Sequence, residues 1–299
     1  MIFVVILLLV CIGMPLLYAW RVWRLDEQTS AAWLLIVVES ALVLALVFLV
    51  GRWDIAGHYT RILLLAVFAA AVLRSLVKHG GRPWRVDAGP SLLRSKWTTM
   101  LTIALFSAGL AYVASGMAPP AGARTLAFPL RDGRFMVGQG GGIGLLNGHA
   151  GHRQQQFAAD LTAIGRAGFR ASGILPGDLD RYVIYGAAVV SPCEGTVLSA
   201  RDGLPDLVPP QADPDNPAGN HVVIECGEVN VELAHLRRGS VEVAPGNRLA
   251  AGDPVGLVGN SGNTTEPHLH IHAVDPESGT GVPMSFGGAV PVRNRLYSG

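Results

Sequence analysis

Four long apolar stretches constrain the fold of this chain more than any other feature. They cover about residues 1–20, 31–50, 62–78 and 99–117, and charged side chains are rare within them. Each stretch approaches the ~20 residues that a helix needs to cross a bilayer core of ~30 Å. The four stretches therefore predict an N-terminal transmembrane region of four helices over residues 1–117.

Two details of these stretches admit more than one interpretation. The first stretch resembles a secretory signal, but it lacks a basic start, and Arg21 and Arg24 follow where a small-residue cleavage site would lie. We therefore expect it to be retained as a span. Glu39 is ionisable and lies within the second stretch, where such a group often marks a transport pathway. Because no second acidic residue or ligand-like cluster accompanies it, we favour a carboxyl group buried against neighbouring helices.

Charge is distributed unequally along the chain and predicts an orientation. Residues 1–118 hold ten Lys/Arg against five Asp/Glu, whereas residues 119–299 hold thirteen against seventeen. The loop between the third and fourth stretches contains Lys78, Arg82, Arg85, Arg94 and Lys96 against Asp87 alone. Basic loops are retained on the cytoplasmic side. We therefore expect a multi-pass protein of the cytoplasmic (inner) membrane whose C-terminal domain lies on the extracytoplasmic or periplasmic side, with the lipid bilayer as a partner.

The composition excludes several classes of protein. Half of the residues are hydrophobic and only 15% are charged, which argues against a single soluble domain and against a disordered chain. The polar half is acidic overall and shows no basic face of any size, so we expect no nucleic-acid partner.

The polar half is predicted to be a separate β domain. Residues 118–127 form a short linker rich in Pro and Gly, and residues 128–299 consist of short apolar runs broken by turn residues. Strands are expected at residues 187–190, 196–199, 222–225, 229–236 and 255–258. A weak helical period appears only at residues 154–167. The domain is large enough to bury a core of its own.

Two of the three cysteines, Cys193 and Cys226, lie on or beside these expected strands. On the oxidising side of a membrane they could form a disulfide, and the alternative is a pair of reduced, buried thiols. Zinc binding by them is disfavoured, because neither belongs to a C-x-x-C pair and a better set of ligands is present.

Three histidines alternate in the segment P-H-L-H-I-H, at positions 268, 270 and 272. On a strand these imidazoles point to one face, while Leu269 and Ile271 point to the packed side. A row of imidazoles on one face is difficult to explain as core, and it favours a zinc site together with further His and Asp residues.

The segment G-N-S-G-N-T-T-E-P-H-L-H-I, preceded by A-H-L-R-R-G-S-V-E-V-A-P-G-N-R-L-A-A-G-D-P-V-G-L-V, resembles the C-terminal signature of the lysostaphin-like zinc metallopeptidases. These are peptidoglycan endopeptidases with the duplicated hybrid motif fold, which is β-sandwich-like and mainly antiparallel. The resemblance covers residues 128–273 and leaves the apolar stretches outside it. It implies one Zn2+ per domain.

The resemblance also implies roles for individual residues. The second His of H-x-H is a metal ligand, here His270, whereas His268 and His235 line the site as catalytic residues. The other ligands usually come from H-x-x-x-D. Asp160 matches the Asp, but Gln156 stands at the His position. The segment N-G-H-A-G-H-R-Q-Q-Q-F-A-A-D-L resembles instead a membrane-anchored subgroup with N-x-H…Q-x-x-A-x-D, which implies His149 as the ligand, with His152 as its rival.

Two imidazoles and one carboxylate leave zinc an open fourth position, as catalytic sites require. The metal would activate water and polarise the scissile carbonyl. No H-E-x-x-H motif places a glutamate as general base, so His268 and His235 must share proton transfer and oxyanion stabilisation.

The expected function is therefore a membrane-anchored zinc metalloendopeptidase that hydrolyses peptide bonds in peptidoglycan cross-links. A catalytically silent domain of the same fold, which binds or activates a cell-wall hydrolase, is the alternative, and a non-peptidoglycan peptide substrate is a third. A regulatory membrane partner is compatible with each of them.

Four further features lie outside this set of residues. His272 is either a contact of the site or an exposed strand residue, and His221 is expected to be structural. The glycine run at residues 138–144 lacks a following Lys-Ser/Thr helix, so we expect a flexible rim and no nucleotide. The acidic, Pro-rich residues 204–216 are expected to form a long loop near the substrate groove.

Overall fold

The computed structural model describes residues 2–85, 96–118 and 120–299, which form two compact units, residues 1–114 and 115–299. Two residues of the expected cytoplasmic loop, Asp87 and Arg94, lie outside the described part of the chain.

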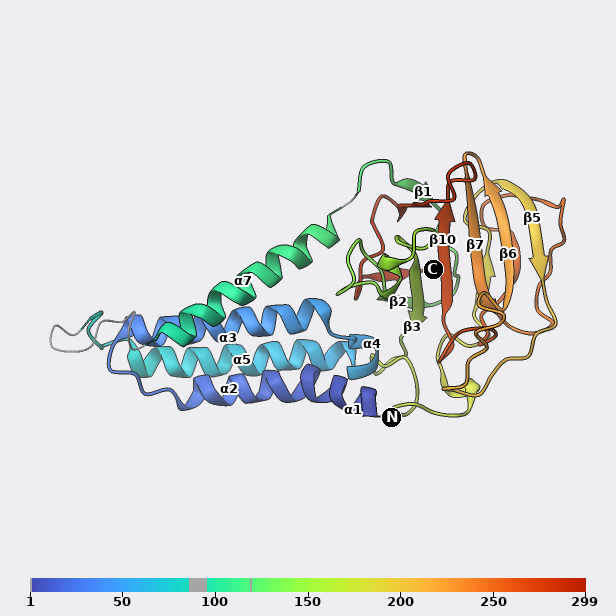
Figure 1. Ribbon diagram of the computed structural model, residues 1–299. Coiled ribbons are helices and arrows are strands. Elements are labelled where there is room, and N and C mark those ends of the chain that lie inside the picture. Colours follow the sequence, from blue (N-terminus) through green and yellow to red (C-terminus); the bar gives the residue numbers. More distant parts are fainter. Residues whose placement is uncertain (1, 86–95, 119) are drawn as a thin grey trace. The chain divides into compact units, whose positions relative to one another are not determined.

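The first unit is helical (Figure 1). Its elements are α1 (Ile2–Leu8), the π-helical turn η1 (Leu9–Gly13), α2 (Met14–Arg24), α3 (Ser30–Val50), α4 (Trp53–Ala56), α5 (His58–His79) and α7 (Trp97–Met117). Four helical segments are long and apolar enough to cross a membrane: Val4–Arg24, Ser30–Val50, His58–His79 and Trp97–Met117. The expectation of four long apolar helices is confirmed.

Polar contacts join the helices of this unit at specific points. The Thr29 hydroxyl accepts a hydrogen bond from the Ala32 amide and so caps the start of α3. Glu39 is buried, as expected, and its carboxylate receives a hydrogen bond of 2.8 Å from Arg21 at the end of α2. Removing either partner would leave the other as a buried or half-buried charge, so this pair fixes α2 against α3.

The second unit is mainly β structure. Its strands are β1 (Arg124–Leu126), β2 (Arg134–Gln139), β3 (Ala159–Ala163), β4 (Ala188–Val190), β5 (Gly195–Arg201), β6 (Asn220–Cys226), β7 (Val229–Leu236), β8 (Arg248–Leu249), β9 (Pro254–Leu257), β10 (Leu269–Val274), β11 (Gly281–Val282), β12 (Met284–Phe286) and β13 (Leu296–Ser298). Short 3₁₀ turns occur at η2 (Gly148–Gly151) and η3 (Leu179–Arg181).

The large sheet has the order β13-β2-β3-β10-β7-β6-β5-β8, with β11 also paired to β10, and all of its pairs are antiparallel. A second sheet pairs β4 with β9 antiparallel, and a third pairs β1 with β12 in parallel. The predicted mainly antiparallel β domain is therefore confirmed. β1 lies within the segment that was expected to be linker.

One expectation about local structure is wrong. Residues 154–167 contain β3 and turns rather than a helix. β3 lies between β2 and β10 and is buried along its whole length, so its side chains do not alternate between apolar and polar. Without that alternation the segment could not be distinguished from a weak helix by its period.

A single hydrophobic core supports the strands that carry the histidines. Leu233 of β7, Ile224 of β6 and Ile271 of β10 are fully buried in it, as are Val189 of β4 and Val255 of β9. The small β4–β9 sheet thus packs on the large sheet through shared apolar contacts. Because β7 and β10 are fixed from behind in this way, their polar side chains are held in defined positions.

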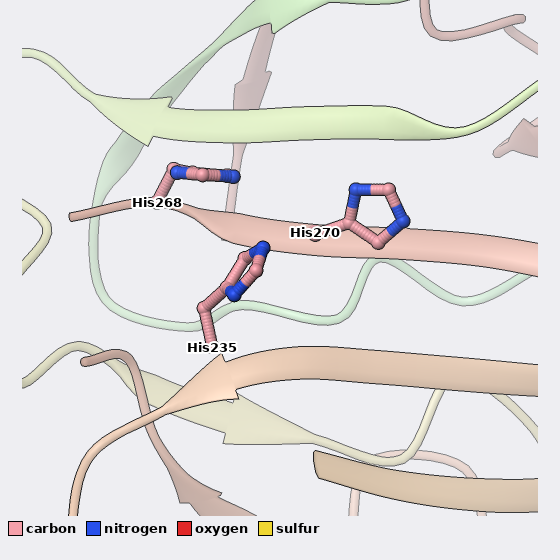
Figure 2. A group of neighbouring side chains, drawn as sticks. All are labelled: His235, His268 and His270. Atoms are coloured by element: carbon pink, nitrogen blue, oxygen red, sulfur yellow. The ribbon is translucent and has the colours of Figure 1, made fainter. Parts of the chain in front are cut away.

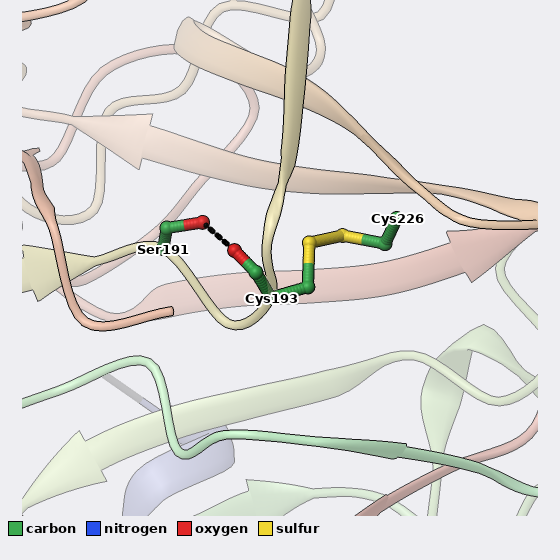
Figure 3. The surroundings of a disulfide bond; sticks show 3 residues. All are labelled: Ser191, Cys193 and Cys226. Carbon is green, nitrogen blue, oxygen red and sulfur yellow. Dashed lines mark hydrogen bonds between the residues drawn. A yellow bond between two sulfur atoms is a disulfide. The ribbon is translucent and has the colours of Figure 1, made fainter. Parts of the chain in front are cut away.

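A disulfide joins Cys193, before β5, to Cys226 at the end of β6 (Figure 3). It connects residues 33 positions apart, and the Ser191 hydroxyl donates a hydrogen bond of 2.7 Å to the Cys193 carbonyl beside it. The disulfide alternative is the one that the structure contains. Closing a loop of this length restricts the unfolded chain and typically stabilises a domain by ~2–4 kcal/mol.

Candidate metal centre

Three neighbouring strands bring the predicted site residues together. In the register of the sheet, His270 of β10 lies opposite Asp160 of β3 on one side and opposite Ala234 of β7 on the other. His235 follows Ala234 directly, and His268 precedes β10 (Figure 2). Residues far apart in the sequence therefore meet because β10 lies between β3 and β7.

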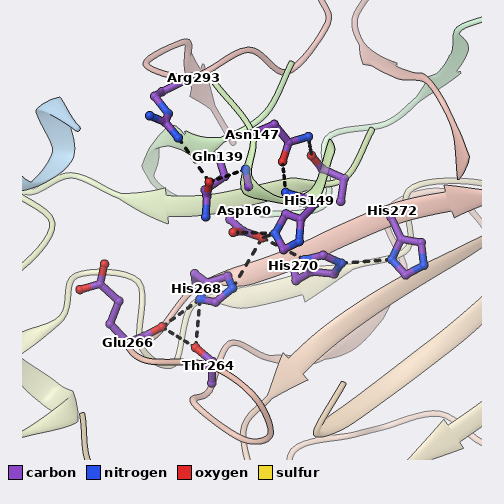
Figure 4. Close-up of polar contacts among 12 residues, drawn as sticks. Gln139, Asn147, His149, Asp160, Thr264, Glu266, His268, His270, His272 and Arg293 are labelled. Carbon is purple, nitrogen blue, oxygen red and sulfur yellow. Dashed lines mark hydrogen bonds and ion pairs between the residues drawn. The ribbon is translucent and has the colours of Figure 1, made fainter. Parts of the chain in front are cut away.

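Two imidazoles converge on the Asp160 carboxylate (Figure 4). His149 Nε2 lies 3.0 Å from both carboxylate oxygens, and His270 Nδ1 lies 2.9 Å from Oδ1. Asp160 and His270 are buried, whereas His149 is half-buried. Both nitrogens therefore point at the same carboxylate oxygen from different elements.

Asn147 fixes the backbone that carries His149. Its side-chain oxygen accepts a hydrogen bond of 3.0 Å from the His149 amide, and its amide group donates to the carbonyls of Gly141, Gln156 and Ala158. The side chain of Asn147 is fully buried. The first residue of N-x-H is thus a structural residue, whose role could be inferred from the motif only once His149 was recognised.

His152, the rival of His149, lies outside the cluster, and so does Gln156 at the usual His position. His152 is exposed. Two groups of described residues could hold a metal ion, His149/Asp160/His270 and His235/His268/His270, and His152 belongs to neither. Gln156, which occupies the usual His position, donates a hydrogen bond of 3.3 Å to the Gly281 carbonyl instead. The segment between His149 and Asp160 therefore turns so that position 149, and not position 156, faces the carboxylate.

Backbone hydrogen bonds support the glycine run before His149. The Gly142 amide donates to the Gly116 carbonyl at 2.9 Å, and the Gly140 amide donates to the Leu146 carbonyl at 3.2 Å. Gly141 has a φ of 108°, a conformation that glycine adopts without strain. The run thus acts as a hydrogen-bonded support for Asn147.

His235 occupies an unusual backbone position. Its φ is 65°, in the left-handed region, and its amide donates to the Ala218 carbonyl, where the β6–β7 pairing is irregular. Such a conformation is costly for a residue other than glycine and requires support from its surroundings. His235 Nδ1 donates a hydrogen bond of 2.9 Å to the Ser261 carbonyl. Because a carbonyl can only accept, Nε2 of neutral His235 carries a lone pair.

Ser261 belongs to the G-N-S-G-N-T segment and clamps this region. Its hydroxyl donates to the Leu236 carbonyl at 2.8 Å and accepts from the Asn220 amide at 2.9 Å. Gly219 passes so close that a Cβ atom there would clash with the Ser261 backbone. This segment therefore supports His235, a function that the sequence signature alone does not indicate.

His268 is held from the side opposite to Asp160. Its Nδ1 donates to the Glu266 carbonyl at 2.9 Å and lies 3.1 Å from the Thr264 hydroxyl, while its Nε2 is 3.6 Å from Asp160 Oδ1. The Glu266 side chain in turn pairs with the buried Arg170 at 2.5 Å. Nε2 of neutral His268 therefore also carries a lone pair directed toward the site.

His272 extends the row of imidazoles inward. It is only 6% exposed, so the alternative of an exposed strand residue is wrong. Its Nδ1 is joined to His270 Nε2 by a hydrogen bond of 3.1 Å, and burial lowers its pKa to about 3. His221 is half-buried, donates to the Gly219 carbonyl and belongs to neither His/Asp group.

The electrostatics of the site favour an ionised Asp160 and lower the pKa values of His235 and His268. Burial opposes ionisation of Asp160, but the imidazoles of His268, His149 and His270 outweigh it and hold its pKa well below the usual value. Burial lowers the pKa of His235 well below its usual value, and neighbouring His268 adds to this effect. Burial also lowers the pKa of His268. His149 differs, because Asp160 outweighs burial and raises its pKa.

The donor atoms fit a metal ion. Two groups could hold one, His149/Asp160/His270 and His235/His268/His270, and the donor atoms within each lie within 4.8 Å of one another. Tetrahedral zinc ligands at ~2.0–2.1 Å from the metal are ~3.3 Å apart. The distances of 2.9–3.0 Å from Asp160 to His149 and His270 are close to this spacing. In the second group, His235 Nδ1 donates to the Ser261 carbonyl and His268 Nδ1 donates to the Glu266 carbonyl. Only Nε2 of these two imidazoles is therefore open to a metal ion.

One family model matches the part of the chain that carries three of these histidines. Residues 179–280 match the model of peptidase family M23. The match covers a third of the chain and includes His235, His268 and His270, whereas His149 and Asp160 precede it. No curated protein gives a significant match.

Several solved structures resemble parts of the chain. A zinc-containing peptidase from Vibrio cholerae is 22% identical with a TM-score of 0.26, over 42% of this chain and 48% of that one. The SpoIIQ–SpoIIIAH pore-forming complex gives 17% identity and a TM-score of 0.27, over 42% and 59%. A catalytic-domain mutant of the prophage-encoded M23 protein EnpA from Enterococcus faecalis gives 25% and 0.21, over 36% and 78%. The chain thus spans about half the length of the first two.

Proposed function

We propose that this protein is a membrane-anchored zinc metalloendopeptidase. The observation that carries the proposal is the convergence of His149 Nε2 and His270 Nδ1 on the buried Asp160 carboxylate. Beside it, His235 and His268 each direct an unprotonated Nε2 into the site. The M23 match over residues 179–280 supports peptidase chemistry in general.

His149, Asp160 and His270 would hold the zinc ion. When bound, zinc supplies Lewis acidity that lowers the pKa of water and polarises the scissile carbonyl. Nε2 of His235 or His268 would accept the proton of the attacking water, because their Nδ1 protons are committed to the Ser261 and Glu266 carbonyls. The protonated imidazole would then donate to the leaving amine or stabilise the oxyanion.

We infer that the substrate is the peptide of peptidoglycan. This inference follows from the sequence resemblance to cell-wall endopeptidases and from the charge distribution, which predicts that the β domain lies outside the cytoplasm. The Cys193–Cys226 disulfide supports the same location, because such bonds persist in oxidising compartments.

The test is digestion of purified sacculi by the full-length protein in detergent, with released peptides identified by mass spectrometry. We expect wild-type protein and His152→Ala to release cross-link peptides, and His270→Ala to release none. An unstructured protein serves as a second substrate. Cleavage of that protein without release from sacculi would contradict the peptidoglycan assignment, and equal release by His270→Ala would contradict the zinc mechanism.

A catalytically silent domain that activates another hydrolase is the second candidate. The observation in its favour is Gln156, which replaces the usual ligand and turns away from the site. Zinc binding without any peptide release from either substrate would support this candidate over the enzyme.

A further inference from the structure

One hollow in the β domain shares no lining residue with the histidine cluster. Its volume is about 570 Å3, and it is lined by residues 131–135, 163–166, 183 and 185–188. These segments are the start of β2, the chain after β3 and the approach to β4. None of the mechanism described above uses them.

The rim of this hollow is basic. Arg131, Arg134 and Arg166 line it and are exposed, and Asp132 is the only acidic residue among the described residues of its lining. The polar half of the chain is acidic overall, so three arginines at one hollow are a local reversal of charge. No local pattern in the sequence brings these arginines together, because they come from two segments that are distant in sequence.

One of the arginines is anchored by a backbone carbonyl. A guanidinium nitrogen of Arg131 donates a hydrogen bond of 2.5 Å to the Gly252 carbonyl. Guanidinium has five N–H donors in a planar fork, so most of them stay available to an anion. Arginine forks match the oxygens of phosphate in particular.

The floor of the hollow is apolar. Phe135 and Ile164 line it but are almost completely buried, so the apolar surface open to a ligand is mainly that of Val183, which is 45% exposed. On one side stands Tyr185, whose hydroxyl donates to Asp206 at 3.4 Å and whose ring lies 5.2 Å from the Arg237 guanidinium. A basic rim above an apolar floor fits a ligand that carries both an anionic group and hydrocarbon.

The short linker limits how far the start of the β domain can lie from the end of the last candidate span. Six residues separate Met117, the end of the last candidate span, from Arg124, the start of β1. Six residues extend over at most ~20 Å, so a bilayer that contains the span keeps its headgroups near the domain. We propose that the hollow binds the phosphate and adjoining chain of an anionic phospholipid, which would orient the domain on the membrane surface.

The experiment uses the full-length protein in nanodiscs of zwitterionic lipid, titrated with soluble short-chain phosphatidylglycerol. Backbone amide exchange is measured at residues 131–135 and 163–166, and inorganic phosphate is titrated in parallel. We expect phosphatidylglycerol to slow exchange at both segments and phosphate at equal concentration to have little effect.

The variants are the double substitution Arg131→Gln/Arg166→Gln and the matched control Arg238→Gln/Arg248→Gln, which removes two exposed arginines elsewhere in the domain. Loss of one arginine near anionic lipid weakens binding about fivefold. The Arg131→Gln/Arg166→Gln variant should therefore raise the midpoint of the lipid titration roughly 30-fold. The control should leave it unchanged, and both variants should melt like wild type. Equal midpoints for the two variants, or equal protection by inorganic phosphate, would overturn the lipid site.

Discussion

At the scale of single residues, the position of His149 depends on Asn147. The Asn147 side chain is fully buried, receives the His149 amide and donates to three carbonyls on either side of it. His149 itself lies on a short 3₁₀ turn, which has little regular structure of its own. Asp160 and His270 are held by their strands, whereas His149 is held by the hydrogen bonds of the Asn147 side chain.

Asn147→Ala should weaken zinc binding about 10–100-fold, as the loss of groups that orient a metal ligand usually does. Zinc affinity is measured by competition with a chelator. Asn263→Ala is the control, because Asn263 is exposed and lies in the other signature segment. If both substitutions changed zinc affinity equally, Asn147 would not be a positioning residue.

At the scale of elements, the site depends on the close crossing of residue 219 over the segment at residues 260–264. Gly219 has a φ of 61° and lies so close to the Ser261 backbone that a Cβ atom would clash with it. The Ser261 carbonyl in turn accepts a hydrogen bond from His235 Nδ1. The crossing thus connects the end of the long loop before β6 to the G-N-S-G-N-T segment. Neither His235 nor His268 would keep its orientation if these two segments separated.

Two glycine substitutions separate steric contact from backbone strain. Gly219 and Gly227 both have a positive φ, 61° and 67°, which is unfavourable for alanine. Alanine at position 219 would also clash with Ser261, whereas open space surrounds position 227. We expect Gly227→Ala to cost about 1 kcal/mol of unfolding free energy and Gly219→Ala at least twice as much. Denaturant unfolding of the full-length protein measures both, and equal costs would contradict the crossing.

The elements also show how much of the molecule the sequence predicts. The five expected strands correspond to β4, β5, β6, β7 and β9, because their alternating side chains and turn residues are local signals. β3 was missed because it is buried along its whole length. The contacts of Asn147 and Ser261 join segments that are distant in sequence, and so does the hollow lined by Arg131, Arg134 and Arg166. No local sequence pattern predicts such contacts.

At the scale of the whole molecule, four apolar helices and an acidic β domain imply two different surroundings for one chain. The charged side chains between the helices are partly paired: Asp26 with Lys78 and Arg82, and Glu27 with Lys96. These pairs neutralise some of the basic loop, but Lys/Arg residues determine orientation during insertion and Asp/Glu residues contribute little. These ion pairs therefore do not change the predicted orientation, which depends on the Lys and Arg residues.

Reporter fusions test this topology. Alkaline phosphatase, which requires disulfides and is active only outside the cytoplasm, should be active after Gly299 and inactive when fused after Arg82. The reverse pattern, or activity at both positions, would contradict the extracytoplasmic location of the β domain and with it the peptidoglycan substrate.

The central claim is that zinc is held by His149, Asp160 and His270. An anomalous difference map of zinc-loaded crystals, recorded at the zinc edge, tests it most directly. The account predicts one peak bound by His149 Nε2, an Asp160 oxygen and His270 Nδ1, with His235 and His268 beside it. A peak among His235, His268 and His270, a peak at His152, or no peak in zinc-loaded crystals would contradict it.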